Sequence, residues 1–149
     1  MTQRVGSIFL IRNDGAALLQ RRDDKPGLMR AGQWVTPGGH CDPGETMEAC
    51  ARREFREETA YECRDLTWLS TVVDPEDPDC RCGMFWARYD ERGTFQCLEG
   101  QELKFVLRSQ AVTYDVPLFL IKLWDIALTA AKTPFLPGAA LCPPVPYKL

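Results

Sequence analysis

The sequence predicts an α+β fold in which a mixed β-sheet is sandwiched between α-helices, an α/β/α sandwich. Three observations indicate this class. Short apolar segments separated by turn residues are typical of strands, only two segments carry apolar residues at helical spacing, and the connections between strands are both local and non-local. A chain of 149 residues without internal repeats suits one domain with a substantial core.

The first part of the chain predicts three extended segments. Arg4–Ile11 indicates a strand that ends in an apolar run, and the Asn-Asp-Gly sequence at 13–15 is a strong turn signal because these residues tolerate positive φ. Ala16–Gln20 then suits the return strand of a hairpin. The polar segment 21–33 predicts a loop, and Trp34–Thr36 a short extended piece.

A helix is expected in the middle of the chain. A loop should run from Gly38 to Gly44, and the helix should begin near Glu45 or Thr46 and end near Thr59. An apolar face at helical spacing supports this helix, and it consists of Met47, Cys50, Ala51 and Phe55.

The second half predicts three more strands and one more helix. The strands are Trp68–Val73, Met84–Tyr89 and Leu103–Leu107, and the segment 74–79, rich in proline and aspartate, predicts a loop after the first of them. The helix should cover Val116–Ala131, with a proline that its first turn can accept. Because this helix is apolar on most sides, it should be buried against the domain or against a partner chain.

The domain is expected to cover residues 1–132, followed by a proline-rich C-terminal tail at 133–149. The tail contains five prolines and no periodicity, so it is either a loose end or an arm lying on a neighbouring chain. Together with the broadly apolar second helix, such an arm makes a homodimer a reasonable expectation.

Charge and hydropathy narrow the classes of partner. The formal net charge of -3 argues against a surface that coats a nucleic-acid polymer. A small nucleotide remains compatible, because a metal ion can neutralise phosphate locally. The N-terminus lacks a signal-peptide pattern, and no stretch reaches the roughly 20 apolar residues of a membrane span, so no membrane association is expected.

The cysteines favour a reducing compartment. Seven are present, an odd number at irregular spacing, so a disulfide framework is not expected and a cytoplasmic location fits better. Cys80 and Cys82 are one residue apart, which is closer than the usual spacing in structural zinc sites, and His40 is the single histidine. A zinc site is therefore not expected.

Three carboxylates mark the predicted first helix. Glu54, Glu57 and Glu58 fall at i, i+3 and i+4, so they share one helical face and repel one another. Such a pattern usually means a solvated face. It also offers the oxygen ligands that Mg²⁺ prefers, and a bound cation would turn the repulsion into coordination.

The segment around these carboxylates resembles the Nudix hydrolase family. The Nudix box has the pattern G-x5-E-x7-R-E-U-x-E-E-x-G-U, where U is a bulky apolar residue. The box positions that match in register are Gly39, Glu45, Arg53, Glu54, Phe55, Glu57, Glu58 and Tyr61. The one departure is Ala60, which replaces a glycine that normally ends the helix, often at positive φ, and it should cost stability on the order of 1 kcal/mol.

The resemblance implies a Nudix fold and metal-dependent hydrolysis of a diphosphate linkage, with Mg²⁺ as cofactor and Mn²⁺ as its substitute. It implies that the metal ligands are the carboxylates of Glu54, Glu57 and Glu58 and the backbone carbonyl of Gly38. It also implies that Glu45 and Arg53 form a structural ion pair that braces the loop against the helix.

A weaker resemblance extends to the MutT-like branch. It implies that Glu99 is a fourth carboxylate that contacts metal or assists the base, with Glu102 as its rival. It further implies that Arg22 contacts the nucleotide and that Asp115 reads a purine edge. Ordinary alternatives stay open: a turn acid for Glu99, a solvated strand-end charge for Arg22, and a helix cap for Asp115.

The resemblance therefore predicts a pyrophosphohydrolase acting on a nucleoside triphosphate or a related small nucleotide. Either Glu54 or Glu99 would take the proton from the attacking water. The alternatives are a nucleotide-sugar or ADP-ribose hydrolase and, less in keeping with the retained carboxylates, a nucleotide-binding sensor without catalysis.

Overall fold

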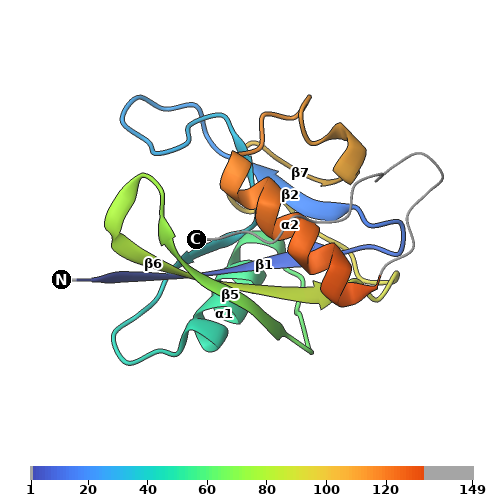
Figure 1. The fold of residues 1–149 in the computed structure, drawn as a ribbon, viewed down its shortest axis with the longest axis horizontal. Coiled ribbons are helices and arrows are strands. Elements are labelled where there is room, and N and C mark those ends of the chain that lie inside the picture. Colours follow the sequence, from blue (N-terminus) through green and yellow to red (C-terminus); the bar gives the residue numbers. More distant parts are fainter. Residues whose placement is uncertain (1, 133–149) are drawn as a thin grey trace.

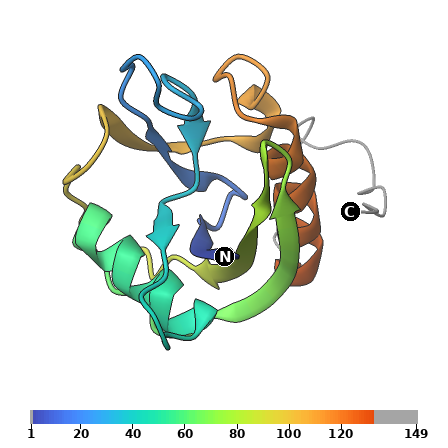
Figure 2. The same cartoon turned by 90° about the vertical axis from the view of Figure 1, so that its left-hand side faces the viewer.

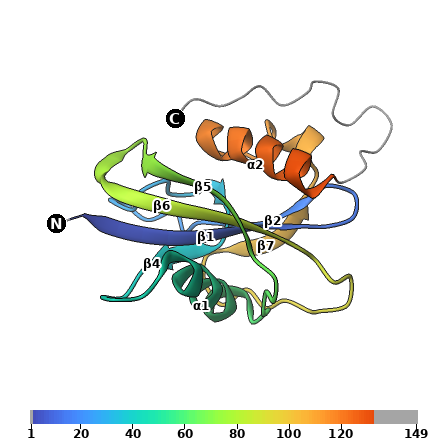
Figure 3. The ribbon, with the colours of Figure 1, turned by 60° about the horizontal axis from the view of Figure 1, so that its bottom comes forward.

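A computed structural model describes residues 2–132. Its seven-stranded mixed sheet has the strand order β3-β2-β1-β6-β5, with β4 paired to β1 and β7 paired to β2. One helix packs on each face, α1 on one side and α2 on the other (Figures 1, 2 and 3). The elements are β1 Gln3–Ile11, β2 Ala17–Arg21, β3 Trp34–Val35, β4 Gly38–His40, α1 Met47–Thr59, β5 Thr67–Asp74, β6 Asp77–Arg88, β7 Glu102–Val106, a short 3-10 helix Arg108–Gln110, and α2 Leu118–Ala131.

The predicted α+β class, with a sheet between helices, is confirmed by this architecture and its likeness to solved structures. The central strand explains why the apolar run at the end of β1 is continuous. β1 pairs antiparallel with β2 and parallel with β6, so it lies in the middle of the sheet. Ile8 and Leu10 belong to the core under α1, whereas Phe9 and Ile11 belong to the core under α2. A strand covered on both faces needs apolar residues at every position rather than at alternate ones.

Glycines allow α1 and β4 to lie directly on β1. A Cβ on Gly6 would stand 2.6 Å from the backbone nitrogen of Ala51 and 2.6 Å from the carbonyl oxygen of Met47, both in α1. A Cβ on Gly38 would overlap the carbonyl oxygen of Gly6. The backbones therefore approach too closely for any side chain at these positions.

Two predicted loops are partly strands. Gly38–His40, expected to be loop, forms β4 against β1, because the sequence reveals the low strand propensity of glycine but not the close approach that requires it. The expected loop at 74–79 shortens to a tight hairpin in which Asp74 pairs with Asp77. Pro78 is tolerated there because β6 pairs with β1 only from Cys80 onward, so its missing N–H leaves no hydrogen bond to β1 unmade.

The helix α2 packs against its own domain, which is one of the two possibilities predicted from its broad apolarity. Six of its side chains are buried: Leu120, Leu123, Trp124, Ala127, Leu128 and Ala131. It begins at Leu118, with Pro117 at the N-cap position rather than inside the first turn. No helix within residues 2–132 is long and apolar enough to cross a membrane. The predicted tail at 133–149 lies outside the described residues.

The end of α1 carries the expected strain at Ala60. This residue caps the helix in the left-handed region, with φ 62° and ψ 8°, and its N–H donates to the carbonyl of Arg56 at 2.8 Å. Glycine adopts this conformation without the clash that a Cβ causes. Ala60→Gly should therefore raise the free energy of unfolding by about 1 kcal/mol. Urea unfolding followed by circular dichroism measures this, and an unchanged or lower midpoint would contradict the assignment of strain.

Candidate active site

A cleft of about 520 Å³ runs across the sheet face, and five of the predicted site residues line it. They come from elements far apart in the sequence: Arg22 after β2, Gly38 in β4, Glu54 and Glu58 in α1, and Glu99 before β7. Glu57 and Asp115 do not belong to the lining.

Glu54 and Glu58 face the cleft because the N-cap fixes where α1 begins and the apolar face fixes which side of the helix packs on the sheet. Thr46 caps the helix by accepting a hydrogen bond from the Ala49 N–H at 3.1 Å. The buried side, which includes Cys50 and Phe55, packs toward the sheet. Glu54 and Glu58, four residues apart, then share the neighbouring side. Glu57 does not line the cleft, and 54% of its side chain is exposed.

Two backbone segments hold Glu58 and Glu99 together. The Gly38 N–H donates to Glu58 Oε2 at 2.9 Å, which ties the carboxyl to β4. The loop that carries Glu99 is fixed by Gln20, whose Nε2 donates to the Glu99 carbonyl at 3.1 Å, and by the Leu98 N–H, which donates to the Glu58 carbonyl at 3.0 Å. The chain just before Glu99 is thus bonded to the end of α1, and residues 99–101 are bonded to the end of β2.

The burial of Glu58 next to Glu99 determines the electrostatics of this part of the cleft. Burial, together with the hydrogen bond and charge of Glu99, raises the pKa of Glu58 to about 9. Two carboxyl groups that are forced together in this way favour either a shared proton or a bound cation. Glu102, the rival for the fourth carboxylate, is exposed, lies 3.6 Å from Lys104 and does not line the cleft.

Arg53 links the loop before α1 to the carboxylates on α1. Its Nε and Nη2 donate to Glu45 at 2.8 and 2.9 Å, so the ion pair between these two residues is present as a bidentate contact. Its Nη1 also donates to Glu54 at 2.8 Å and to Glu57 at 3.1 Å. The hydrogen bonds from Arg53 are the main reason that the pKa of Glu45 falls to about 2. One guanidinium therefore orients three carboxylates.

Of the two residues predicted to contact the nucleotide, Arg22 lies in the cleft and Asp115 does not. Arg22 lines the cleft, and within residues 2–132 its buried Nε has no hydrogen-bond partner. Asp115 is exposed, and its carboxylate accepts a hydrogen bond from Gln33 Nε2 at 3.2 Å. The alternative of Asp115 as a helix cap is wrong, because Pro117 occupies the N-cap position and no side chain caps α2.

Sequence reasoning missed a buried ion pair in the same cleft. Arg30 donates to both carboxylate oxygens of Asp74, and the two side chains are only 13% and 8% exposed. Burial opposes the ionised carboxyl, but the hydrogen bonds from Arg30 and from the Glu76 N–H, together with the charge of Arg30, outweigh it, and the pKa of Asp74 is lowered. The partners lie 44 residues apart in irregular or strand-end positions, so no local pattern could have paired them.

A mixed sheet between two helices, with a glycine-supported loop and a carboxylate-bearing helix at one cleft, defines a Nudix-type domain. Residues 1–122 match the model of the NUDIX domain family, and the chain belongs to that family. The family resemblance expected from the box is therefore confirmed.

The chain is similar to several curated proteins and solved structures. It is 48% identical over 58 residues to the nucleoside triphosphatase NudI of Escherichia coli K12 / DH10B, a match that spans 39% of this chain and only 40% of that protein. Its fold resembles the MutT protein of Methanosarcina mazei Go1, with a TM-score of 0.72 and 19% identity over 88% of this chain and 96% of the other. It also resembles the NUDIX domain of Shewanella oneidensis NrtR, crystallised with ADP ribose, with a TM-score of 0.73 and 18% identity over 88% and 89% of the two chains.

Proposed function

We propose that this protein is a Mg²⁺-dependent pyrophosphohydrolase that cleaves a diphosphate linkage in a nucleoside triphosphate or a related small nucleotide. The observation that carries the proposal is the packing of the Glu58 and Glu99 carboxyl groups against each other in the cleft that Glu54 also lines. The partial match to a nucleoside triphosphatase favours a triphosphate as substrate.

The donor set of the cleft suits a hard divalent cation. Glu54, Glu58 and Glu99 would supply carboxylate oxygens and Gly38 a backbone carbonyl, while Glu57 would join through the exposed side of α1. Without a cation, the contact between Glu58 and Glu99 is repulsive whenever both are ionised. A bound Mg²⁺ or Mn²⁺ ion would neutralise the diphosphate and make an attacking water more acidic.

We assign the acceptance of the water proton to Glu99 rather than Glu54. Arg53 donates to Glu54 at 2.8 Å, so this carboxylate is already engaged by a cationic side chain. Glu99 is exposed and lies beside Glu58. Within residues 2–132, no arginine donates a hydrogen bond to its carboxylate. Arg53 would then hold the Glu54 carboxylate in a fixed orientation for a cation.

A nucleotide screen in Mg²⁺ tests the activity. The purified protein is incubated with nucleoside triphosphates, nucleotide sugars and ADP-ribose, and released phosphate and pyrophosphate are measured separately. We expect pyrophosphate from one or more triphosphates, and no release after chelation of the metal. Cleavage restricted to nucleotide sugars or ADP-ribose would favour the alternative hydrolase class. Nucleotide binding without turnover of any compound would instead support a sensor.

Arg22 provides a separate test of substrate binding. Its guanidinium lines the cleft with one buried N–H unpaired, and a substrate phosphate would supply the missing acceptor. Arg22→Ala should raise KM by about 10- to 100-fold, because hydrogen bonds to charged groups contribute roughly 1.5–3 kcal/mol. Arg21→Ala is the matched control, since Arg21 is exposed and does not line the cleft. Equal KM values for the two variants would remove Arg22 from the substrate site.

A further inference from the structure

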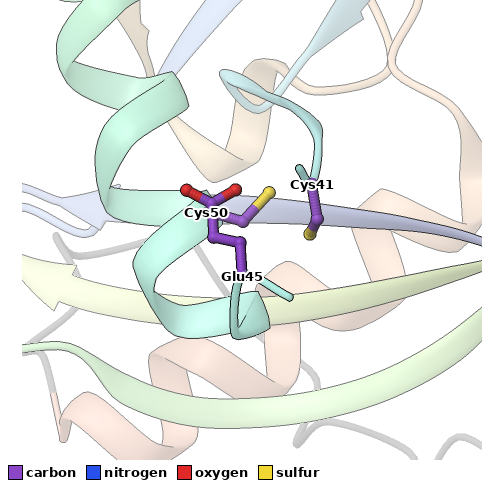
Figure 4. A group of neighbouring side chains, drawn as sticks. All are labelled: Cys41, Glu45 and Cys50. Carbon is purple, nitrogen blue, oxygen red and sulfur yellow. The ribbon is translucent and has the colours of Figure 1, made fainter. Parts of the chain in front are cut away.

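A second group of ligating side chains lies beside the active-site cleft rather than in it. It consists of Cys41 in the loop after β4, Glu45 just before α1, and Cys50 in the second turn of α1. The two sulfur atoms and a carboxylate oxygen all lie within 4.8 Å of one another. Figure 4 shows the three side chains converging from the loop and the helix, with the Cys50 sulfur directed toward Cys41.

We propose that Cys41, Cys50 and Glu45 form a binding site for a soft divalent cation of the Zn²⁺ type, distinct from the Mg²⁺ site of the cleft. Thiolate ligands select zinc-like ions, whereas the all-oxygen donors of the cleft select Mg²⁺. Zn–S bonds of about 2.3 Å and Zn–O bonds of about 2.1 Å place tetrahedral ligands roughly 3.5–3.8 Å apart. Small side-chain rotations would bring the three atoms to that spacing, and water would fill the fourth position.

Each ligand is already held by a contact outside the group. The Cys41 N–H donates to the Arg4 carbonyl at 2.8 Å, which fixes the loop to β1. Cys50 is fully buried, and its thiol lies 3.3 Å from the Gly39 carbonyl. Glu45 accepts hydrogen bonds from Arg53 and from the Asp42 N–H at 3.0 Å. The contacts of Cys41 and Glu45 would persist with a cation bound and would orient these ligands, whereas the hydrogen bond of the Cys50 thiol would be given up with its proton.

The charge of the group also suits a dication. Two thiolates and one carboxylate carry three negative charges, which the cation and the Arg53 guanidinium on Glu45 would balance. Cys41 is only half-buried, so an ion can enter from solvent. In the other thiol group, Asp74, Cys80 and Cys82, all three residues are buried, so no ligand of that group is open to an ion from solvent. That group is therefore the natural comparison.

The site would join two segments that matter for catalysis. The strand β4, which leads into Cys41, carries Gly38 and Gly39, and α1 carries Glu54 and Glu58. A cation held by Cys41 and Cys50 would cross-link this loop to the helix, and its binding would release the thiol protons. The site would thus stabilise the active-site frame without touching the substrate.

Cobalt spectroscopy on the full chain tests the proposal. The protein is reduced with a phosphine, Mg²⁺ is added in excess to occupy oxygen-rich sites, and Co²⁺ is titrated. We expect a thiolate-to-cobalt charge-transfer band that saturates at one equivalent and is lost when Zn²⁺ is added. Cys41→Ser should weaken Co²⁺ binding by at least about 100-fold, since loss of an outer contact alone costs 10- to 100-fold.

Control variants identify the group responsible. Cys97→Ser, at an exposed position, and the double change Cys80→Ser and Cys82→Ser should both keep the band. Circular dichroism verifies folding, and Cys50→Ala provides a second variant from the site. Absence of the band in the unaltered protein, its persistence in Cys41→Ser, or its loss in the Cys80 and Cys82 double variant would each overturn the assignment. The readout is absorption, so it does not depend on the proposed hydrolysis.

Discussion

Replacing Glu58 with glutamine should reduce Mg²⁺-dependent hydrolysis by about 10³-fold while the protein remains folded. The change removes a carboxylate from the centre of the cleft, and metal-assisted charge neutralisation is worth several kcal/mol in the transition state. Glutamine has the same shape, so its side-chain oxygen can still accept the Gly38 N–H that Glu58 Oε2 now accepts at 2.9 Å. Steady-state kinetics and a thermal melt measure the two properties separately.

Three further substitutions show whether a loss of hydrolysis in Glu58→Gln is specific to the metal-binding carboxylates. Glu57→Gln should also abolish turnover if the exposed side of α1 contributes to cation binding. Glu62→Gln, at an exposed position after the helix, should leave kcat and KM unchanged. Glu102→Gln should likewise have little effect, because Glu102 does not line the cleft. Full activity in both Glu57→Gln and Glu58→Gln would refute the assignment of these residues as metal ligands.

Gly6→Ala should destabilise the protein by about 3 kcal/mol, the upper end of the usual cost of overpacking. The added methyl group would stand 2.6 Å from backbone atoms of α1, and neither the helix nor the central strand can give way without disturbing the core. Because α1 carries Glu54 and Glu58, hydrolysis should fall with stability. Chemical denaturation measures the first effect and kinetics the second.

Gly27→Ala is the matched control for this overpacking. Gly27 has φ +81°, but no atom lies within 4 Å of the place where a Cβ would stand. The alanine there should cost only about 1 kcal/mol, from the left-handed backbone alone. Similar losses in the two variants would show that helix and strand can separate at Gly6, contrary to the close packing described above.

The sequence is most informative where spacing alone defines geometry. Glu54 and Glu58 share a helix face because they are four residues apart in one helix. The register of the box predicts that Glu45 is the partner of Arg53, and the two side chains make a bidentate contact. The left-handed conformation of Ala60 follows from the same register. These features are local, so they can be predicted without knowledge of the sheet.

Features that depend on the sheet could not be predicted. Arg30 meets Asp74 only because the long loop after β2 folds over the hairpin between β5 and β6. Cys41 and Cys50 are separated by a spacing that matches no common metal motif, yet a turn and one helical step bring their thiols together. The segment Gly38–His40 is expected to be a loop, although it forms β4. Glycine-rich sequence is the same in a flexible loop and at a tight backbone contact, so the sequence cannot distinguish the two.

The parallel pairing of β1 with β6 has a consequence for how the chain acquires its fold. Gln3 pairs with Cys80 and Ile11 with Arg88, so β1 lacks its parallel neighbour until most of the domain has been synthesised. During that interval, the hydrophobic segment Ile8–Ile11 can associate with other nascent chains. Such long-range pairing also slows folding. Yield at high expression levels should therefore depend on how well chaperones shield this strand.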